Sequence, residues 1–70
     1  MDAVTFGKNV KRCREEAGLS PAKLASQASL SRNTIRNIEL ARHSPTLTAV
    51  FRIAEVLGKH PASLLTDLAA

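Results

Sequence analysis

Two helix start signals lie only eleven residues apart in this chain, and they constrain its fold more than any other feature. Ser20 can accept a hydrogen bond from a free helix amide, and Pro21 suits the first helical position because it has no amide to leave unpaired. Ser31 is a second N-cap candidate, so the spacing predicts one helix over residues 21–28 and another over residues 32–40. About three residues remain to join them, and so short a joint forces the two helices to cross sharply.

Glycine, proline and hydroxyl residues delimit the other segments of the chain. Apolar spacing and flanking breakers predict three further helices, over residues 5–17, over residues 47–57 and from Pro61 onward. No alternating run of β-branched and aromatic residues predicts a strand. Residues 1–70 are therefore expected to form a single compact all-α domain of five helices.

The predicted helices differ in how much of their surface is apolar. In the first helix, Phe6, Val10, Cys13 and Ala17 share one face, and Lys8, Lys11, Arg12, Glu15 and Glu16 lie opposite. The fourth helix has a broad apolar stripe formed by Leu47, Val50, Phe51, Ala54 and Leu57, widened by Ile53 and Val56. Such a helix is usually central to a core or half-buried in a dimer interface. The last helix is preceded by His60, which is not among the usual N-cap residues, so we expect a poor cap there.

The net charge of +4 is concentrated on the segment from Pro21 to Pro45. That segment contains four basic residues and Glu39 as its single acid, a balance of +3, whereas the other 45 residues contain six basic and five acidic residues, a balance of +1. Excess positive charge on one short segment favours a polyanionic partner such as nucleic acid, and a solvated basic surface is the ordinary alternative.

Other functional classes find little support in the residues. His43 and His60 lie in separate loops without a partner at metal-binding spacing, and Cys13 is the single cysteine, so we expect no metal, cofactor or disulfide. We find no small-molecule site and no glycine-rich phosphate loop, and we expect no enzyme. No apolar run reaches the roughly 18 residues of a membrane span, and the N-terminus lacks the apolar core of a signal peptide, which favours a cytoplasmic protein.

The third predicted helix divides into two faces on a wheel of about 100° per residue. The inner face carries Thr34, Ile35, Ile38 and Glu39, and the outer face carries Arg32, Asn33, Arg36 and Asn37. Arginine can pair with guanine O6 and N7, and asparagine with adenine N6 and N7, while a single helix fits the major groove of B-DNA. The alternative is a solvated face, although such faces commonly include the glutamate or lysine that is absent here.

Several motifs, in their order and spacing, resemble the helix-turn-helix domain of phage repressors and Cro proteins, also called the Xre family. They are RCREEAGLS, KLA, SLSRNTIRNIE, the proline at position 45 and IAEVLG, within a run from Thr5 to Leu65 that covers nearly the whole chain. The resemblance implies a DNA-binding fold with its helix-turn-helix at about residues 21–40, in which residues 32–40 form the recognition helix. It also implies a small transcriptional regulator, such as a repressor, a restriction–modification controller or an antitoxin-type autoregulator.

The resemblance also implies roles for individual residues. Base contacts are expected from Arg32, Asn33, Arg36 and Asn37, with a phosphate as the alternative target of Arg36. Phosphate contacts are expected from Ser31, Thr34, Arg42, His43 and Lys23. At two turn positions where glycine is common in the family, this chain has Ser29 and Ala41. Each costs on the order of 1 kcal/mol if its backbone is left-handed.

An ion pair between Arg14 of the first helix and Glu39 of the third is a further implication of the resemblance. Glu39 lies on the core-facing side of its helix, where an unpaired carboxylate would be costly to desolvate, and Arg14 flanks the apolar face of the first helix. The alternative is that both charges are solvated, and the pair then contributes about 0–1 kcal/mol.

A homodimer on a two-fold symmetric, double-stranded DNA operator is the expected assembly. A chain of 70 residues is marginally stable alone, and one helix reads only a few base pairs. The candidate interface consists of the C-terminal apolar residues Val56, Leu64, Leu65 and Leu68. The alternative is that Leu64 and Leu65 complete the monomer core. For the whole chain, the rival hypothesis is a protein-interaction or RNA-binding module that retains the helix-turn-helix fold.

Overall fold

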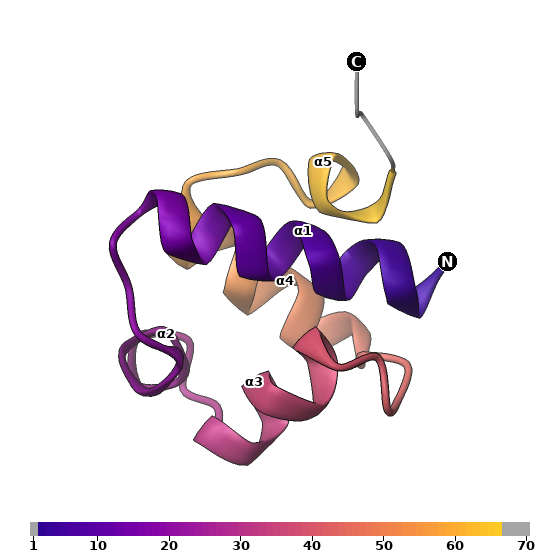
Figure 1. The fold of residues 1–70 in the computed structure, drawn as a ribbon. Coiled ribbons are helices and arrows are strands. Elements are labelled where there is room, and N and C mark those ends of the chain that lie inside the picture. The colour runs from indigo at the N-terminus through magenta and orange to yellow at the C-terminus, as the bar shows by residue number, and fades with distance from the viewer. Residues whose placement is uncertain (1, 67–70) are drawn as a thin grey trace.

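The computed structural model describes residues 2–66, which form five helices without a strand (Figure 1). The helices are α1 (Ala3–Glu16), α2 (Pro21–Gln27), α3 (Arg32–Glu39), α4 (Leu47–Leu57) and α5 (Pro61–Leu65). The predicted all-α fold is therefore confirmed. The predicted boundaries of α2, α3 and α4 agree with the observed ones to within one residue, because strong local signals start and stop these helices.

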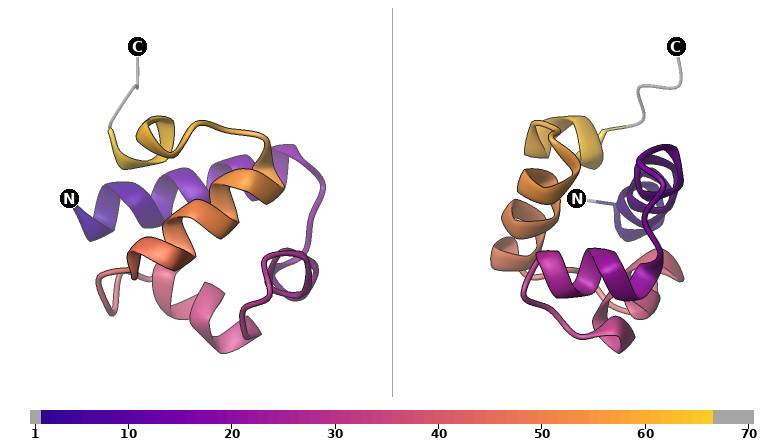
Figure 2. Two further views of the ribbon diagram at one scale, coloured as in Figure 1. Left: turned by 180° about the vertical axis from the view of Figure 1, so that it is seen from behind. Right: turned by 90° about the vertical axis from the view of Figure 1, so that its left-hand side faces the viewer.

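Helix α1 is the central element of the packing. It contacts α3, α4 and α5, whereas α2 packs mainly against α3. Views from three sides show α4 crossing beside α1, α5 at one end of the molecule, and α2 and α3 together at the opposite end (Figures 1 and 2). The helix-turn-helix unit therefore forms one end of the molecule, where the outer face of α3 has no other helix over it.

Side-chain caps start the helices where the local sequence supplies them. The hydroxyl groups of Ser20, Ser31 and Thr46 accept hydrogen bonds of 3.0–3.1 Å from backbone amides of the first turn, those of Lys23, Thr34 and Ala49. The cap of α5 differs from expectation. His60 Nδ1 accepts a hydrogen bond of 3.1 Å from the backbone amide of Ala62, so the imidazole caps the N-terminus of α5 as a serine or threonine hydroxyl would.

Helix α1 begins two residues before the predicted start, because Asp2 caps it. One carboxylate oxygen of Asp2 accepts a hydrogen bond of 2.9 Å from the backbone amide of Val4, and the other accepts one of 2.9 Å from the hydroxyl of Thr5. The Thr5 hydroxyl, followed by the Val4 amide, holds the pKa of Asp2 below its ordinary value, since both bonds favour the charged carboxylate. The predicted start of this helix rested on the apolar pattern that begins at Phe6, and that pattern does not indicate a cap at Asp2.

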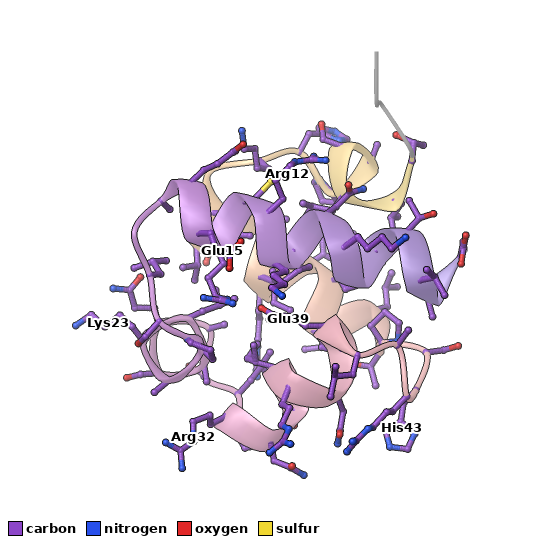
Figure 3. The ribbon with its side chains drawn as sticks, viewed as in Figure 1. Arg12, Glu15, Lys23, Arg32, Glu39 and His43 are labelled. Carbon is purple, nitrogen blue, oxygen red and sulfur yellow. The ribbon has the colours of Figure 1, made fainter. Side chains whose placement is uncertain are left out.

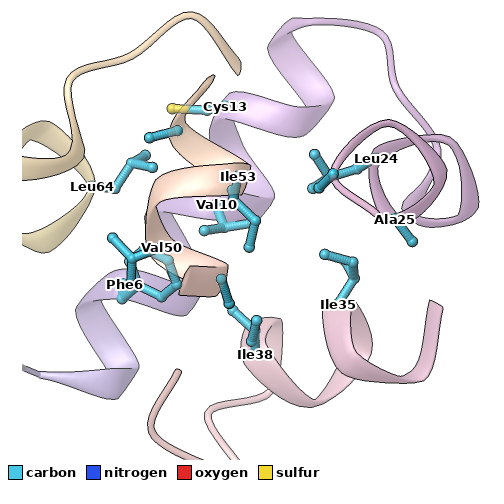
Figure 4. Packing of buried hydrophobic residues seen from close by; sticks show 13 residues of the cluster. Phe6, Val10, Cys13, Leu24, Ala25, Ile35, Ile38, Val50, Ile53 and Leu64 are labelled. Carbon is cyan, nitrogen blue, oxygen red and sulfur yellow. The ribbon is translucent and has the colours of Figure 1, made fainter. Parts of the chain in front are cut away.

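The core is assembled from one face of each helix (Figure 4). Its largest fully buried side chains are Phe6 and Val10 of α1, Leu24 of α2, Ile35 of α3, Val50 and Ile53 of α4, and Leu64 of α5. Cys13 is buried at the edge of this cluster as a free thiol. All five helices thus contribute to one core, and the inner face of α3 is anchored in it.

Only part of the apolar stripe predicted for α4 lies in the core of the monomer. Leu47 and Phe51 are 66% and 54% exposed, so the core does not cover them, whereas the stripe was expected to be central to a core or half-buried in a dimer interface. The buried face of α4 runs instead through Ala49, Val50, Ile53 and Ala54. Leu47 and Phe51 lie roughly 60° and 100° around the helix from Val50, outside the arc that the neighbouring helices cover. The wheel alone does not reveal how wide that arc is.

The short joint between α2 and α3 depends on a left-handed residue. Ser29 has a φ of 57° and Ala41, after α3, has a φ of 56°, so the left-handed backbone on which the expected strain depended is present at both turn positions. In the joint, the amide of Leu30 donates a hydrogen bond of 2.8 Å to the carbonyl of Ala25, which closes the end of α2. The chain can therefore turn into α3 within a few residues, at the cost of strain that glycine would avoid.

Helices α1 and α3 make a close backbone contact at Gly7. A Cβ atom at this position would overlap the carbonyl oxygen of Ile38 and would lie 3.1 Å from that of Glu39. Gly7 itself is buried. The C-terminal end of α3 therefore rests directly on the backbone of α1, an approach that only glycine permits.

Candidate nucleic-acid interface

The outer face of α3 is built on a helix whose two ends are fixed. At the N-terminus of α3, the hydroxyl of Ser31 accepts a hydrogen bond from the backbone amide of Thr34. On the inner side of α3, Ile35 and Ile38 are buried. Arg32, Asn33 and Arg36 are exposed, whereas Asn37 is half-buried. Three of the four predicted base-contact residues thus project freely from the molecule, and Asn37 lies at the border of the exposed face. Figure 3 shows Arg32 pointing away from the body of the protein.

Two open grooves flank α3, one on each side. The α1-side groove, of about 680 Å³, separates α3 from α1 and the start of α2, and it is lined by Lys11, Pro21, Arg32, Asn33, Arg36, Glu39 and Leu40. The loop-side groove, of about 340 Å³, separates α3 from the loop that follows it and the start of α4, and its polar lining includes Thr34, Asn37, His43, Ser44 and Thr46. Basic side chains are concentrated along the first groove and hydroxyl groups along the second, and each groove is lined by one asparagine.

The predicted phosphate-contact residues do not form one cluster. Thr34 and His43 line the loop-side groove, and Arg42 is exposed in the same loop. The hydroxyl of Ser31 is 2.8 Å from that of Thr34, at the N-terminus of α3. Lys23 is exposed on α2, on the opposite side of the molecule from His43 in Figure 3. The structure therefore brings Thr34 and His43 together and leaves Lys23 apart from them.

The ion pair that the resemblance implies is present between α1 and α3. Arg14 Nε donates to one carboxylate oxygen of Glu39 over 2.7 Å, and its second donor reaches the other oxygen over 3.1 Å. Both side chains are about nine-tenths buried. A third donor of Arg14 bonds the carbonyl oxygen of Leu19 over 2.9 Å. The hydrogen bond to Glu39 raises the pKa of Arg14 above its ordinary value and outweighs its desolvation. The two bonds between Arg14 and Glu39 tie α3 to α1.

Two residues of α1 carry roles that sequence patterns did not indicate. Asn9 is buried, and its side-chain amide donates hydrogen bonds of 3.0 Å to the carbonyl oxygens of Leu64 and Thr66, which fastens the end of α5 to α1. Lys11 was placed with the solvated residues of the first helix, yet it lines the α1-side groove. Its position three residues before Arg14 was the available signal, because residues three apart share a helix side.

The candidate dimer residues have unequal access to a partner. Leu64 is fully buried in the monomer core. It therefore completes that core, which was the alternative to a place in a dimer interface. Val56 and Leu65 are half-buried against the same cluster. Leu68 lies outside the described residues. The exposed large apolar side chains of residues 2–66 are at other positions, namely Val4, Leu40, Leu47 and Phe51.

Residues 2–66 contain no group of three or more histidine, cysteine, aspartate or glutamate side chains arranged to hold a metal ion. Within that same range, no helix combines the length and apolar character that crossing a bilayer would require.

Comparison with known proteins places this arrangement among DNA-binding folds. The model of the helix-turn-helix family matches residues 10–64. An immunity repressor protein of Bacillus phage phi105 is 36% identical over 64 residues, which are 91% of this chain and 44% of the repressor. An uncharacterized HTH-type transcriptional regulator of Methanothermobacter thermautotrophicus is 38% identical over 50 residues, 71% of this chain and 72% of that protein.

A solved structure gives the same result for the fold. The restriction-modification controller protein C.AhdI from Aeromonas hydrophila matches with a TM-score of 0.86 at 28% identity, over 90% of this chain and 96% of the controller. The chain thus spans nearly all of the controller but less than half of the phage repressor.

Proposed function

The chain belongs to the helix-turn-helix family, and we propose that it is a transcriptional regulator that binds specific double-stranded DNA with α3 in the major groove. The observation that carries the proposal is the outward projection of Arg32, Asn33 and Arg36 from a helix whose other face is locked into the core. A cytoplasmic location, where such a regulator would meet DNA, is part of the proposal.

The proposed base contacts follow from the side chains and their exposure. Arg32 and Asn33 stand at the N-terminus of α3, the part of a recognition helix that meets base edges first. Arg36 is exposed one turn further on and can reach a base or a phosphate. Asn37 lies beside the loop-side groove, so we assign it to a base at the edge of the contacted site. Guanidinium and amide groups at these positions can distinguish guanine and adenine in the major groove.

The proposed phosphate contacts lie on both sides of α3. Thr34 and His43 line the loop-side groove, and Arg42 is exposed beside it, which suits one DNA strand. Ser31 at the N-cap of α3 adds the positive end of the helix dipole to this set. Lys23, at some distance on α2, would reach the backbone farther along the duplex.

We propose that the protein acts as a homodimer on an operator with two-fold symmetry. Half-sites one helical turn apart would give two copies of α3 access to successive major grooves. Val56 and Leu65 are the candidate interface residues that retain partial exposure, together with Leu68 outside the described range. Sedimentation analysis should show concentration-dependent dimers, and Leu65→Asp should shift them to monomer. A wild-type monomer at high concentration, both free and on DNA, would contradict the dimer.

Selection of bound sequences from a random duplex pool, followed by gel-shift titration, tests DNA binding directly. We expect a recurrent motif and an affinity that falls steeply with salt. Arg32→Ala and Asn33→Ala should each weaken binding to the selected site by about 1–3 kcal/mol and leave binding to random duplex nearly unchanged. Arg12→Ala, on the far side of α1, is the charge control.

Two outcomes would redirect the interpretation. Equal losses on selected and random duplex would make Arg32 or Asn33 a phosphate contact. The absence of salt-dependent binding to any duplex would overturn the DNA-binding proposal and favour the protein-interaction or RNA-binding alternative.

A further inference from the structure

The α1-side groove has a basic lining that the proposed contacts do not fully use. Lys11 of α1 faces Arg32 and Arg36 of α3 across this groove. Lys11 and both arginines are exposed, and no ion pair between residues 2–66 involves any of the three. The groove therefore presents three cationic side chains to a ligand at the same end of the molecule as the recognition helix.

The one acid in the groove does not cancel this charge. Glu39 is held by two hydrogen bonds from Arg14, of 2.7 and 3.1 Å, and its side chain is about nine-tenths buried. Both oxygens of the Glu39 carboxylate accept hydrogen bonds from Arg14, and Lys11 forms no ion pair with this carboxylate. An anion entering the groove would meet the cations without competition from Glu39.

The position of the groove relative to α3 indicates which anion it would meet. A helix that lies in the major groove has one phosphate backbone on each side, because that groove is only about 12 Å wide. On the loop side, Thr34, Arg42 and His43 are available to the first backbone. On the opposite side, the α1-side groove faces the second backbone, and Lys11 is the cation there that does not belong to α3.

We propose that Lys11 binds a DNA phosphate on the strand that passes along the α1-side groove, and so helps to fix the position of α3 in the major groove. This inference rests on the proposed function. A lysine ammonium on a flexible stem suits such a contact, because it neutralises charge without demanding a planar partner. The contact would carry no sequence information, since the phosphate backbone is the same at every base pair.

A salt titration of DNA binding separates this role from a general effect of charge. Each neutralised phosphate contributes about 0.9 to the slope of log affinity against log salt. Lys11→Ala should therefore lower the magnitude of the slope by about 0.9 per protomer, or about 1.8 for the proposed dimer, and should weaken binding about five- to tenfold per protomer at 0.1 M salt. The loss should be equal on selected and random duplex, and Lys11→Arg should restore the slope.

Arg12→Ala is the matched control, because it removes the same charge from the adjacent residue. Arg12 lies on the side of α1 away from α3 (Figure 3) and does not line either groove. A slope for Lys11→Ala equal to that of Arg12→Ala would overturn the role of Lys11 while leaving the proposed function intact. A loss confined to the selected duplex would overturn it as well. Failure of the wild-type protein to bind duplex would instead overturn the proposed function, and Lys11 with it.

Discussion

The side-chain amide of Asn9 donates a 3.0 Å hydrogen bond to the carbonyl oxygen of Leu64, across 55 residues of sequence. A second bond of the same length joins this amide to the carbonyl of Thr66. Carbonyl groups at a helix C-terminus lack partners within the helix. One buried asparagine on α1 therefore satisfies the open end of α5 and holds it where Leu64 fills the core.

Replacing Asn9 with alanine should lower the free energy of unfolding by about 1–3 kcal/mol, because carbonyl groups of α5 would lose a buried donor. Urea denaturation followed by circular dichroism measures this change. Asn33→Ala is the matched control, since Asn33 is exposed on α3 and its loss should change stability by less than about 0.5 kcal/mol. Equal stabilities of the two variants would contradict the clamp.

Breaking the ion pair from one side should be more damaging than removing it completely. Arg14→Met or Glu39→Leu leaves an unpaired charge that is largely buried, and each should cost about 3–5 kcal/mol. The double variant should lose clearly less than the sum, because neither charge is then left without a partner. A double-mutant cycle by denaturant unfolding tests this. Strict additivity would mean that Arg14 and Glu39 do not interact.

Gly7→Ala should destabilise the protein although alanine is the better helix former. Alanine gains about 1 kcal/mol in helix propensity over glycine, but its Cβ would overlap the carbonyl oxygen of Ile38. Overpacking of this kind costs about 1–3 kcal/mol, and the α1–α3 contact has little freedom to yield because it involves backbone atoms. Thermal unfolding should show a lowered midpoint. A gel-shift titration of the same variant should show weaker DNA binding. A raised midpoint would contradict the close contact.

The cap at Asp2 predicts a specific dependence of stability on pH. The pKa of Asp2 is lowered in the folded state. The contribution of Asp2 to the free energy of unfolding is therefore complete above its unfolded-state pKa of about 3.9, and it is lost as the pH falls through its folded-state pKa. Wild type should therefore lose more stability than Asp2→Asn between pH 5 and pH 2 (about the range in which carboxyl groups titrate). Asparagine keeps a cap acceptor and does not titrate. Parallel pH profiles of the urea midpoint would contradict this prediction.

The features that sequence patterns predicted are local ones. Ser20, Ser31 and Thr46 each cap a helix through an amide three residues away, so the start of each helix is encoded within one turn. The two faces of α3 follow from the same short-range periodicity, and they place Ile35 in the core and Arg32 in solvent. The fold class and the outer face of the recognition helix were therefore accessible without coordinates.

The features that were missed depend on neighbours that sequence does not locate. Phe51 belongs to an apolar helix, but its exposure depends on how much of α4 the other helices cover. Gly7 and Asn9 act on carbonyl groups that lie more than 30 and 50 residues away. Lys11 belongs to a groove only because the close α1–α3 contact brings the two helices together. Such relationships arise from the packing of whole elements, and no short pattern contains them.

Helix α3 is held in place by Ile35, Ile38 and Glu39 and by the close contact of its backbone with Gly7 of α1, and these contacts lie away from its exposed face. The buried face that anchors α3 and the exposed face that carries Arg32, Asn33 and Arg36 are therefore separate parts of one eight-residue helix. Under the proposed function, substitutions at positions 32, 33 and 36 would change the DNA sequence that is contacted and would leave the packing that holds α3 in place unaltered.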